Sequence, residues 1–195
     1  MAFTNYETNE IHCKALYFGP RGSGKSTNFT AIYQSQENEL AHAHSFSKHN
    51  NQFFEFLPLV LGKIDKYTVK LHLYTMPKLQ VYESVTTTLL KGLDGFVFVF
   101  DSRLSAMHEN VLAWQKVREL LASENYNMLT MPRVLQYNKR DHKDAVSLQI
   151  LRTELNRTGQ VDVEANASQG VGTMETVQLL ADQILTELSH KPLKT

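Results

Sequence analysis

The chain has 195 residues with 20 basic and 20 acidic side chains, so its formal net charge is zero. This balance argues against a nucleic-acid partner held by bulk charge, and the length suffices for one domain, residues 1–195, with a sizeable core. The single cysteine, Cys13, permits no internal disulfide and favours a reducing cytosol. Without a secretory signal, lipidation motif or membrane-length apolar run, we expect a cytoplasmic protein with no membrane anchor of its own.

A glycine-rich segment, residues 19–26, follows the apolar run 15–18 and precedes a helical pattern. It matches the P-loop pattern G-x-x-x-x-G-K-[ST], whose glycines let backbone N–H groups approach a phosphate at the positive end of a helix. Lys25 supplies a charge for the outer phosphates, and the Ser26 hydroxyl is placed to bind Mg²⁺. The residues predicted to contact nucleotide here are Gly19, Arg21, Gly22, Ser23, Gly24, Lys25, Ser26 and Thr27.

The rest of the chain alternates between strand and helix patterns. Strands are predicted at residues 11–18, 53–61, 68–74, 95–100, 133–137 and 161–165, and helices at about 25–34, up to 91, 107–123, 147–155 and 173–188. The second and third strands are joined by a short polar turn and read as a hairpin, with Pro58 placing the second strand at an edge or a bulge. We therefore predict an α/β fold with a mostly parallel six-stranded sheet, one antiparallel edge hairpin and helices on both faces.

The sequence Asn138-Lys139-Arg140-Asp141 follows the fifth predicted strand and has the form N-K-x-D. The Asp141 carboxylate can accept two parallel hydrogen bonds from guanine, whereas adenine offers no such donor pair. Asn138 can bridge the base edge and the P-loop, and the Lys139 stem can lie along the ring. In a P-loop protein this motif selects guanine, so GTP and GDP are the predicted ligands.

A third loop, Asn166-Ala167-Ser168, follows the last predicted strand. With three motifs in this order, the chain resembles a Ras-like small GTPase and, more narrowly, the bacterial MglA family of polarity and motility GTPases, over essentially its full length. By this resemblance the fold is the P-loop small-GTPase fold, and the Ala167 backbone N–H contacts the guanine carbonyl. The segments that carry the family resemblance are residues 3–6, 19–26, 53–59, 72–77, 91–95 and 136–141.

The resemblance implies a cytosolic GTP/GDP switch that uses Mg²⁺ and controls polarity or motility through partner proteins, which could recruit it to a cell pole. The expected docking segments are the polar loops 36–52 and 75–81, because they flank the outer phosphate that distinguishes GTP from GDP. A GTPase-activating or exchange protein is a further expected partner.

The chain departs from the family at the residues that hydrolyse GTP. Family members have glycine at the position of Lys78 and a water-orienting glutamine at the position of Leu79. They carry an arginine and a Mg²⁺-binding threonine where ungapped counting places Asn50 and Asn51. Gln80 is one place from the position of the family's glutamine, and a local register shift would bring it there. The residue that orients the attacking water is therefore left unassigned between Leu79 and Gln80.

Hydrolysis is therefore expected to be slow. One alternative is a pseudo-GTPase scaffold whose partner binding does not depend on the nucleotide. Another is a P-loop metabolite kinase, which the N-K-x-D motif disfavours.

Overall fold

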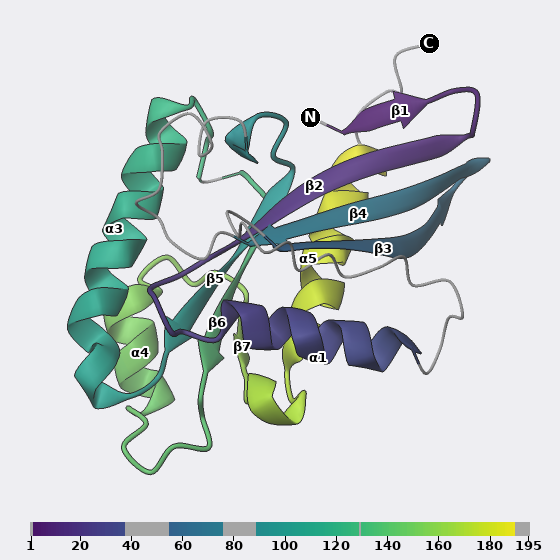
Figure 1. Cartoon of the computed structure of the whole chain (residues 1–195). Helices are drawn as coiled ribbons and strands as arrows, with labels where there is room; N and C mark the ends of the chain where they lie inside the picture. Colours follow the sequence, from purple (N-terminus) through teal and green to yellow (C-terminus); the bar gives the residue numbers. More distant parts are fainter. Residues whose placement is uncertain (1, 38–54, 76–88, 129, 190–195) are drawn as a thin grey trace.

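The computed structural model describes residues 2–37, 55–75, 89–128 and 130–189, which form an α/β structure around one sheet (Figure 1). The strands are β1 (Phe3–Asn5), β2 (Glu10–Phe18), β3 (Glu55–Ile64), β4 (Tyr67–Thr75), β5 (Gly95–Asp101), β6 (Arg133–Asn138) and β7 (Asp162–Glu164). The helices are α1 (Lys25–Glu37), α3 (Met107–Ser123), α4 (Leu148–Leu155) and α5 (Thr173–Ser189), with the 3-10 turns η1 (Leu104–Ala106) and η2 (Ala167–Gln169).

The sheet order is β3-β4-β2-β5-β6-β7, and every neighbouring pair in this order is parallel except the β3–β4 hairpin. This confirms the predicted mostly parallel sheet with an antiparallel edge hairpin. The described residues contain a seventh strand, β1, which the sequence analysis did not predict. It pairs antiparallel with the start of β2, before the pairing of β2 with β5 begins at Ala15. Three residues are too few to show an alternating pattern.

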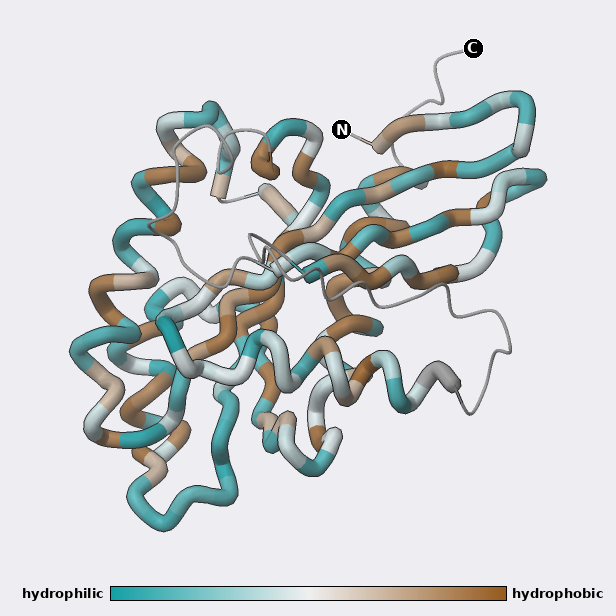
Figure 2. The backbone as a smooth tube through the Cα atoms, viewed as in Figure 1, coloured by the Kyte–Doolittle hydropathy of each residue, from teal (hydrophilic) through white to brown (hydrophobic). Residues whose placement is uncertain are grey.

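The sheet separates two apolar cores because successive side chains of a strand point to opposite faces. In β5, Val97 and Val99 join the cluster beneath α1 and α5, whereas its three phenylalanines join the cluster beneath α3 and α4. Figure 1 shows these two helix pairs on opposite faces of the sheet, and Figure 2 shows the central strands as the most hydrophobic part of the chain. All seven residues of β5 are buried, as predicted for a central parallel strand.

Several local predictions are confirmed in detail. The Ser147 hydroxyl accepts a hydrogen bond from the Ile150 N–H at 3.4 Å and caps α4. Pro58 lies on the edge strand β3, opposite His72, while the bulge lies further along, between Val60 and Gly62.

The first helix extends to Glu37, three residues beyond its predicted end, and so takes in the first two residues of the predicted loop 36–52. The rest of that loop lies outside the described residues, as do residues 76–88. None of the described helices combines the length and the apolar character needed to cross a membrane.

Candidate nucleotide-binding site

The predicted P-loop connects the carboxyl end of β2 to the amino end of α1, which begins at Lys25. Two of its glycines have positive φ values and no room for a side chain. A Cβ on Gly19 (φ 142°) would lie 2.3 Å from the Val99 carbonyl oxygen, and one on Gly24 (φ 101°) would lie 2.1 Å from Asn138 Nδ2. Glycine at these positions therefore lets the loop pass tightly against β5 and against the start of the N-K-x-D motif.

The Lys25 side chain lies inside this loop and is only 7% exposed. Its Nζ donates hydrogen bonds to the carbonyl oxygens of Gly19 and Pro20, both at 2.9 Å. Burial lowers the pKa of Lys25 to about 8, while the negative charge of Glu55 acts in the opposite direction. A phosphate at the loop would add to the negative charge of Glu55 and stabilise this buried ammonium group.

The Asn138 side chain joins the three predicted motifs. Its Nδ2 donates to the Ser23 carbonyl oxygen at 2.8 Å, and its Oδ1 accepts the Ala167 N–H at 2.9 Å. Because Asn138 is 2% exposed, both bonds are shielded from water. One side chain at the end of β6 therefore fixes the P-loop and the loop after β7 relative to each other.

The rest of the N-K-x-D motif forms the turn after β6. Lys139 has a left-handed backbone conformation (φ 64°), and its Nζ lies 2.8 Å from Asp101 Oδ2. Arg103 binds the same carboxylate at 2.6 Å. Burial works to raise the pKa of Asp101, but hydrogen bonds from Arg103 and Lys139 outweigh it and lower that pKa below its usual value. Asp101 therefore holds the Lys139 head group in one place.

The Asp141 side chain is exposed, and it forms no hydrogen bond or ion pair with the described residues. Its carboxylate oxygens are therefore available to a ligand, as guanine recognition requires.

The third loop begins η2 at Ala167, and the Ser168 hydroxyl bonds to the Asn166 side chain at 2.6 Å. The Ala167 N–H, predicted to contact guanine, already donates to Asn138, so a base carbonyl at this position would share that donor. Ala167 and Ser168 line a pocket of about 530 Å³ together with Ser26 and Thr27 from α1. The structure thus brings the first and third motifs to one hollow, with Arg21 exposed at the edge of the P-loop.

A residue that the sequence analysis missed, Glu55, lies in the same pocket as Ser26. Glu55 is 5% exposed and pairs in register with Thr75 at the carboxyl end of β4. Glu55 Oε2 and Thr75 Oγ1 are buried and have no hydrogen-bond partner among the described residues. Hard oxygen atoms of this kind suit Mg²⁺, so the residues present fit the predicted metal, with Ser26 and Glu55 as the groups that would hold it.

A buried polar network beneath the P-loop was also missed. Asn28 of α1 and Gln136 of β6 hydrogen-bond to each other, and Gln136 Nε2 also donates to the Thr176 hydroxyl of α5 at 2.8 Å. The signal in the sequence was the polar Gln136 inside an otherwise apolar strand pattern, which indicates a satisfied partner elsewhere.

The residues predicted to govern hydrolysis lie outside the described residues. These are Lys78, Leu79 and Gln80 in one segment and Asn50 and Asn51 in the other. Their roles stay as predicted from the sequence.

No family model matches the chain. It is 39% identical over 191 residues to the mutual gliding-motility protein MglA of Myxococcus xanthus, an alignment that covers 96% of this chain and 98% of that protein. It is 26% identical over 182 residues to the Ras-related protein YPTC6 of Chlamydomonas reinhardtii, which covers 91% of this chain and 75% of that protein. With this extent of identity, and a P-loop joined to an N-K-x-D turn on a mostly parallel sheet, the chain belongs to the MglA family of Ras-like small GTPases.

Proposed function

We propose that this protein is a guanine-nucleotide switch that controls cell polarity or motility through partner proteins, working in the cytoplasm and recruited to a pole by those partners. The observation that carries the proposal is the double contact of Asn138 with the Ser23 carbonyl and the Ala167 N–H. This contact joins the P-loop, the N-K-x-D turn and the loop after β7, which supports a nucleotide site built from all three. The process is proposed from the Myxococcus relative, whose name refers to gliding motility.

The chain's own groups would bind the nucleotide from its two ends. The N–H groups at the start of α1 and the Lys25 ammonium would meet the phosphates, and the Asp141 carboxylate would accept the N1–H and amino group of guanine. Mg²⁺, held by Ser26 and Glu55, would supply positive charge that neutralises the phosphate oxygens. Asp101 would keep Lys139 positioned, so that its stem lies against the base.

Nucleotide selectivity tests this function directly. Binding of fluorescent GDP, ADP and xanthosine diphosphate is measured for the unmodified protein and for Asp141→Asn. We expect GDP to bind at least about 100-fold more tightly than ADP. Adenine cannot donate the two hydrogen bonds that guanine gives to the Asp141 carboxylate, and each such charge-assisted bond contributes about 1.5–3 kcal/mol. Asp141→Asn should lose GDP and gain the xanthine nucleotide, since its amide pairs a donor with the xanthine carbonyl.

The matched control is Asp144→Asn, an exposed carboxylate in the same turn that pairs with His142. It should leave the preference for GDP unchanged. Equal binding of ADP and GDP by the unmodified protein would overturn the proposal.

We further propose that partners read the bound nucleotide through loops 36–52 and 75–81 and that intrinsic hydrolysis is slow. A partner could then act as a GTPase-activating or exchange protein. The Lys78 and Leu79 departures in the second loop favour one competing function, a scaffold whose partner binding ignores the nucleotide. Partner affinity measured with GTP-loaded and GDP-loaded protein distinguishes a switch from a scaffold. A switch requires different affinities for the two states, because a partner that binds both equally cannot respond to the nucleotide.

A further inference from the structure

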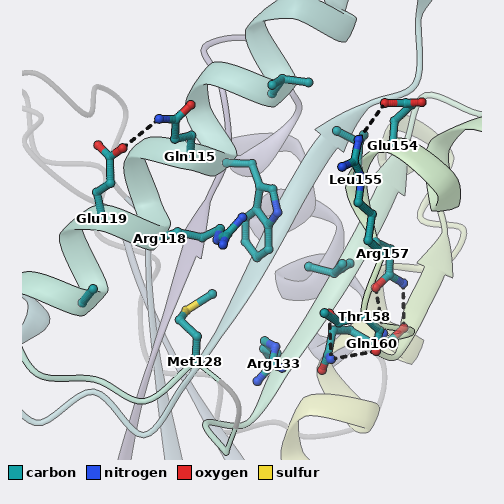
Figure 3. A pocket seen from close by; sticks show the side chains of 15 residues that line it. Gln115, Arg118, Glu119, Met128, Arg133, Glu154, Leu155, Arg157, Thr158 and Gln160 are labelled. Atoms are coloured by element: carbon teal, nitrogen blue, oxygen red, sulfur yellow. Dashed lines mark hydrogen bonds and ion pairs between the residues drawn. The ribbon is translucent and has the colours of Figure 1, made fainter.

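A second pocket, of about 810 Å³, opens between α3 and α4 (Figure 3). It lies at the opposite end of the sheet from the nucleotide site. Arg133, which lines it, is the first residue of β6, whereas Asn138 is the last. At about 3.3 Å per residue these two positions are about 17 Å apart, so the pocket is separate from the proposed guanine site.

Part of the wall of this pocket is apolar. It includes Trp114 of α3, Leu135 of β6 and Leu155 of α4. The Trp114 ring packs edge-on against Phe98 at 4.8 Å between centroids, so the core beneath it fixes its position. Such a surface suits the flat apolar body of a ligand.

Three arginines give the pocket its positive charge. Arg133 is 6% exposed, and its Nη1 donates to the Met131 carbonyl oxygen at 2.9 Å. Burial lowers the pKa of Arg133, and no carboxylate of the described residues forms an ion pair with it. A guanidinium that stays charged while buried, with no carboxylate to pair with, is costly and favours an anionic partner.

The remaining charges leave an excess of one positive charge. Arg118 is exposed, reaches toward the pocket from α3 (Figure 3) and has no hydrogen bond or ion pair with the described residues. Arg157 lies 3.4 Å from Glu154, and Glu119 accepts a hydrogen bond from Gln115. The three arginines thus face two glutamates, of which one is matched to Arg157.

We propose that this pocket binds a small organic anion, with one negative group met by Arg118 and Arg133 and an apolar ring system lying against Trp114. The volume is within the range of small-molecule sites, about 300–1,000 Å³. An excess of one positive charge selects a monoanion over a polyphosphate. The site would therefore take a second ligand while the nucleotide site is filled.

Trp114 is the only tryptophan in the chain and lines this pocket, so its fluorescence responds to a ligand bound there. The probe is 8-anilinonaphthalene-1-sulfonate, a monoanion with a flat apolar body, titrated into the GDP-loaded full chain with tryptophan excitation. We expect one saturable site with energy transfer from Trp114. The uncharged analogue N-phenyl-1-naphthylamine should bind at least about tenfold more weakly, because it lacks the charge-assisted contact.

Three variants locate the site. Arg118→Gln and Arg133→Met should each lower the affinity for the sulfonate probe at least about tenfold, a loss typical of one charge-assisted hydrogen bond. Lys116→Gln should leave this affinity unchanged, because Lys116 lies two residues from Arg118 on α3 but does not line the pocket. Circular dichroism and GDP binding check that Arg133→Met folds, and the exposed Arg118 provides the second, independent variant.

Equal binding of the charged and uncharged probes would overturn the proposal and leave an apolar groove only. The proposal would also be overturned by unchanged affinity in both arginine variants, by an equal loss of affinity in Lys116→Gln, or by the absence of saturable energy transfer.

Discussion

The side-chain amides of Asn28 and Gln136 exchange two hydrogen bonds, each 2.9 Å long, across 108 residues of sequence. Both residues are fully buried. Asn28 lies in the first turn of α1, directly after the P-loop, and Gln136 lies two residues before Asn138 on β6. The pair therefore fixes the start of α1, which follows the P-loop, relative to the end of β6, which precedes the N-K-x-D turn.

This pair predicts a non-additive effect on stability. Gln136→Met leaves the Asn28 amide buried with an unmade hydrogen bond and should lower the free energy of unfolding by about 1–3 kcal/mol. Asn28→Leu should cost a similar amount. The double variant should cost less than the sum, because replacing both partners by apolar groups removes the unsatisfied atoms. Urea unfolding of the nucleotide-free protein and of the three variants measures this double-mutant cycle. If the losses in unfolding free energy of the two single variants simply add up in the double variant, the predicted coupling is wrong.

The sequence predicted the fold well where a pattern is long. The alternation in β4 and the uniform burial of β5 follow directly from their residues, because strand period and apolar content determine which faces are covered. The short strand β1 was missed, because its pairing depends on the turn that brings it back along β2. The end of α1 was placed too early because its last turn is polar.

The sequence indicated only those candidate site residues that belong to a motif. Motif spacing predicted Lys25 and Asn138 as site residues, and the structure places Lys25 inside the P-loop and Asn138 in hydrogen-bond contact with it. Glu55 and Asp101 were missed, because a single acidic residue at a strand end has no pattern of its own. The role of such a residue depends on the neighbours that the fold places beside it, which are Thr75 for Glu55 and Lys139 for Asp101.

The buried Lys25 predicts proton uptake on nucleotide binding. Burial lowers the pKa of Lys25 from 10.5 to about 8, so the unfolded chain binds more protons than the folded nucleotide-free protein between these pH values. Stability of the nucleotide-free protein should therefore rise with pH through this window, as the folded state no longer needs to carry the buried charge. A bound phosphate should restore the charge, so GDP binding near pH 9 should take up close to one proton.

Titration calorimetry at about pH 9 in two buffers of different ionisation enthalpy measures this uptake. At about pH 6.5 the lysine is already protonated, and the uptake from this group should vanish. Lys25→Arg is the matched control, because its guanidinium stays charged throughout and should take up no proton. Equal uptake in the control would show that another group is responsible.

The altered switch residues predict slow intrinsic hydrolysis. Leu79 has no polar group to orient water, and Asn50 has no charge to meet the transition state, where an arginine typically contributes about 10³–10⁵ in rate. Single-turnover hydrolysis of bound GTP should be slow in the unmodified protein and faster in Leu79→Gln and Asn50→Arg, most of all in the double variant. Gln80→Ala tests the shifted register. A large loss of rate in that variant would assign water positioning to Gln80 and overturn the role of Leu79.

The last prediction concerns Glu55, whose buried carboxylate shares a pocket with Ser26 and has one oxygen without a partner among the described residues. Glu55→Gln keeps the shape and removes the charge. Release of fluorescent GDP, followed against free Mg²⁺, should need about 10- to 100-fold more Mg²⁺ for half-maximal retention, corresponding to one charge-assisted contact of about 1.5–3 kcal/mol. Glu164→Gln, an exposed residue paired with Arg140, is the control and should leave the Mg²⁺ dependence unchanged. If Glu55 serves only to balance Lys25, release should change equally with and without Mg²⁺, and the metal-binding role would be wrong.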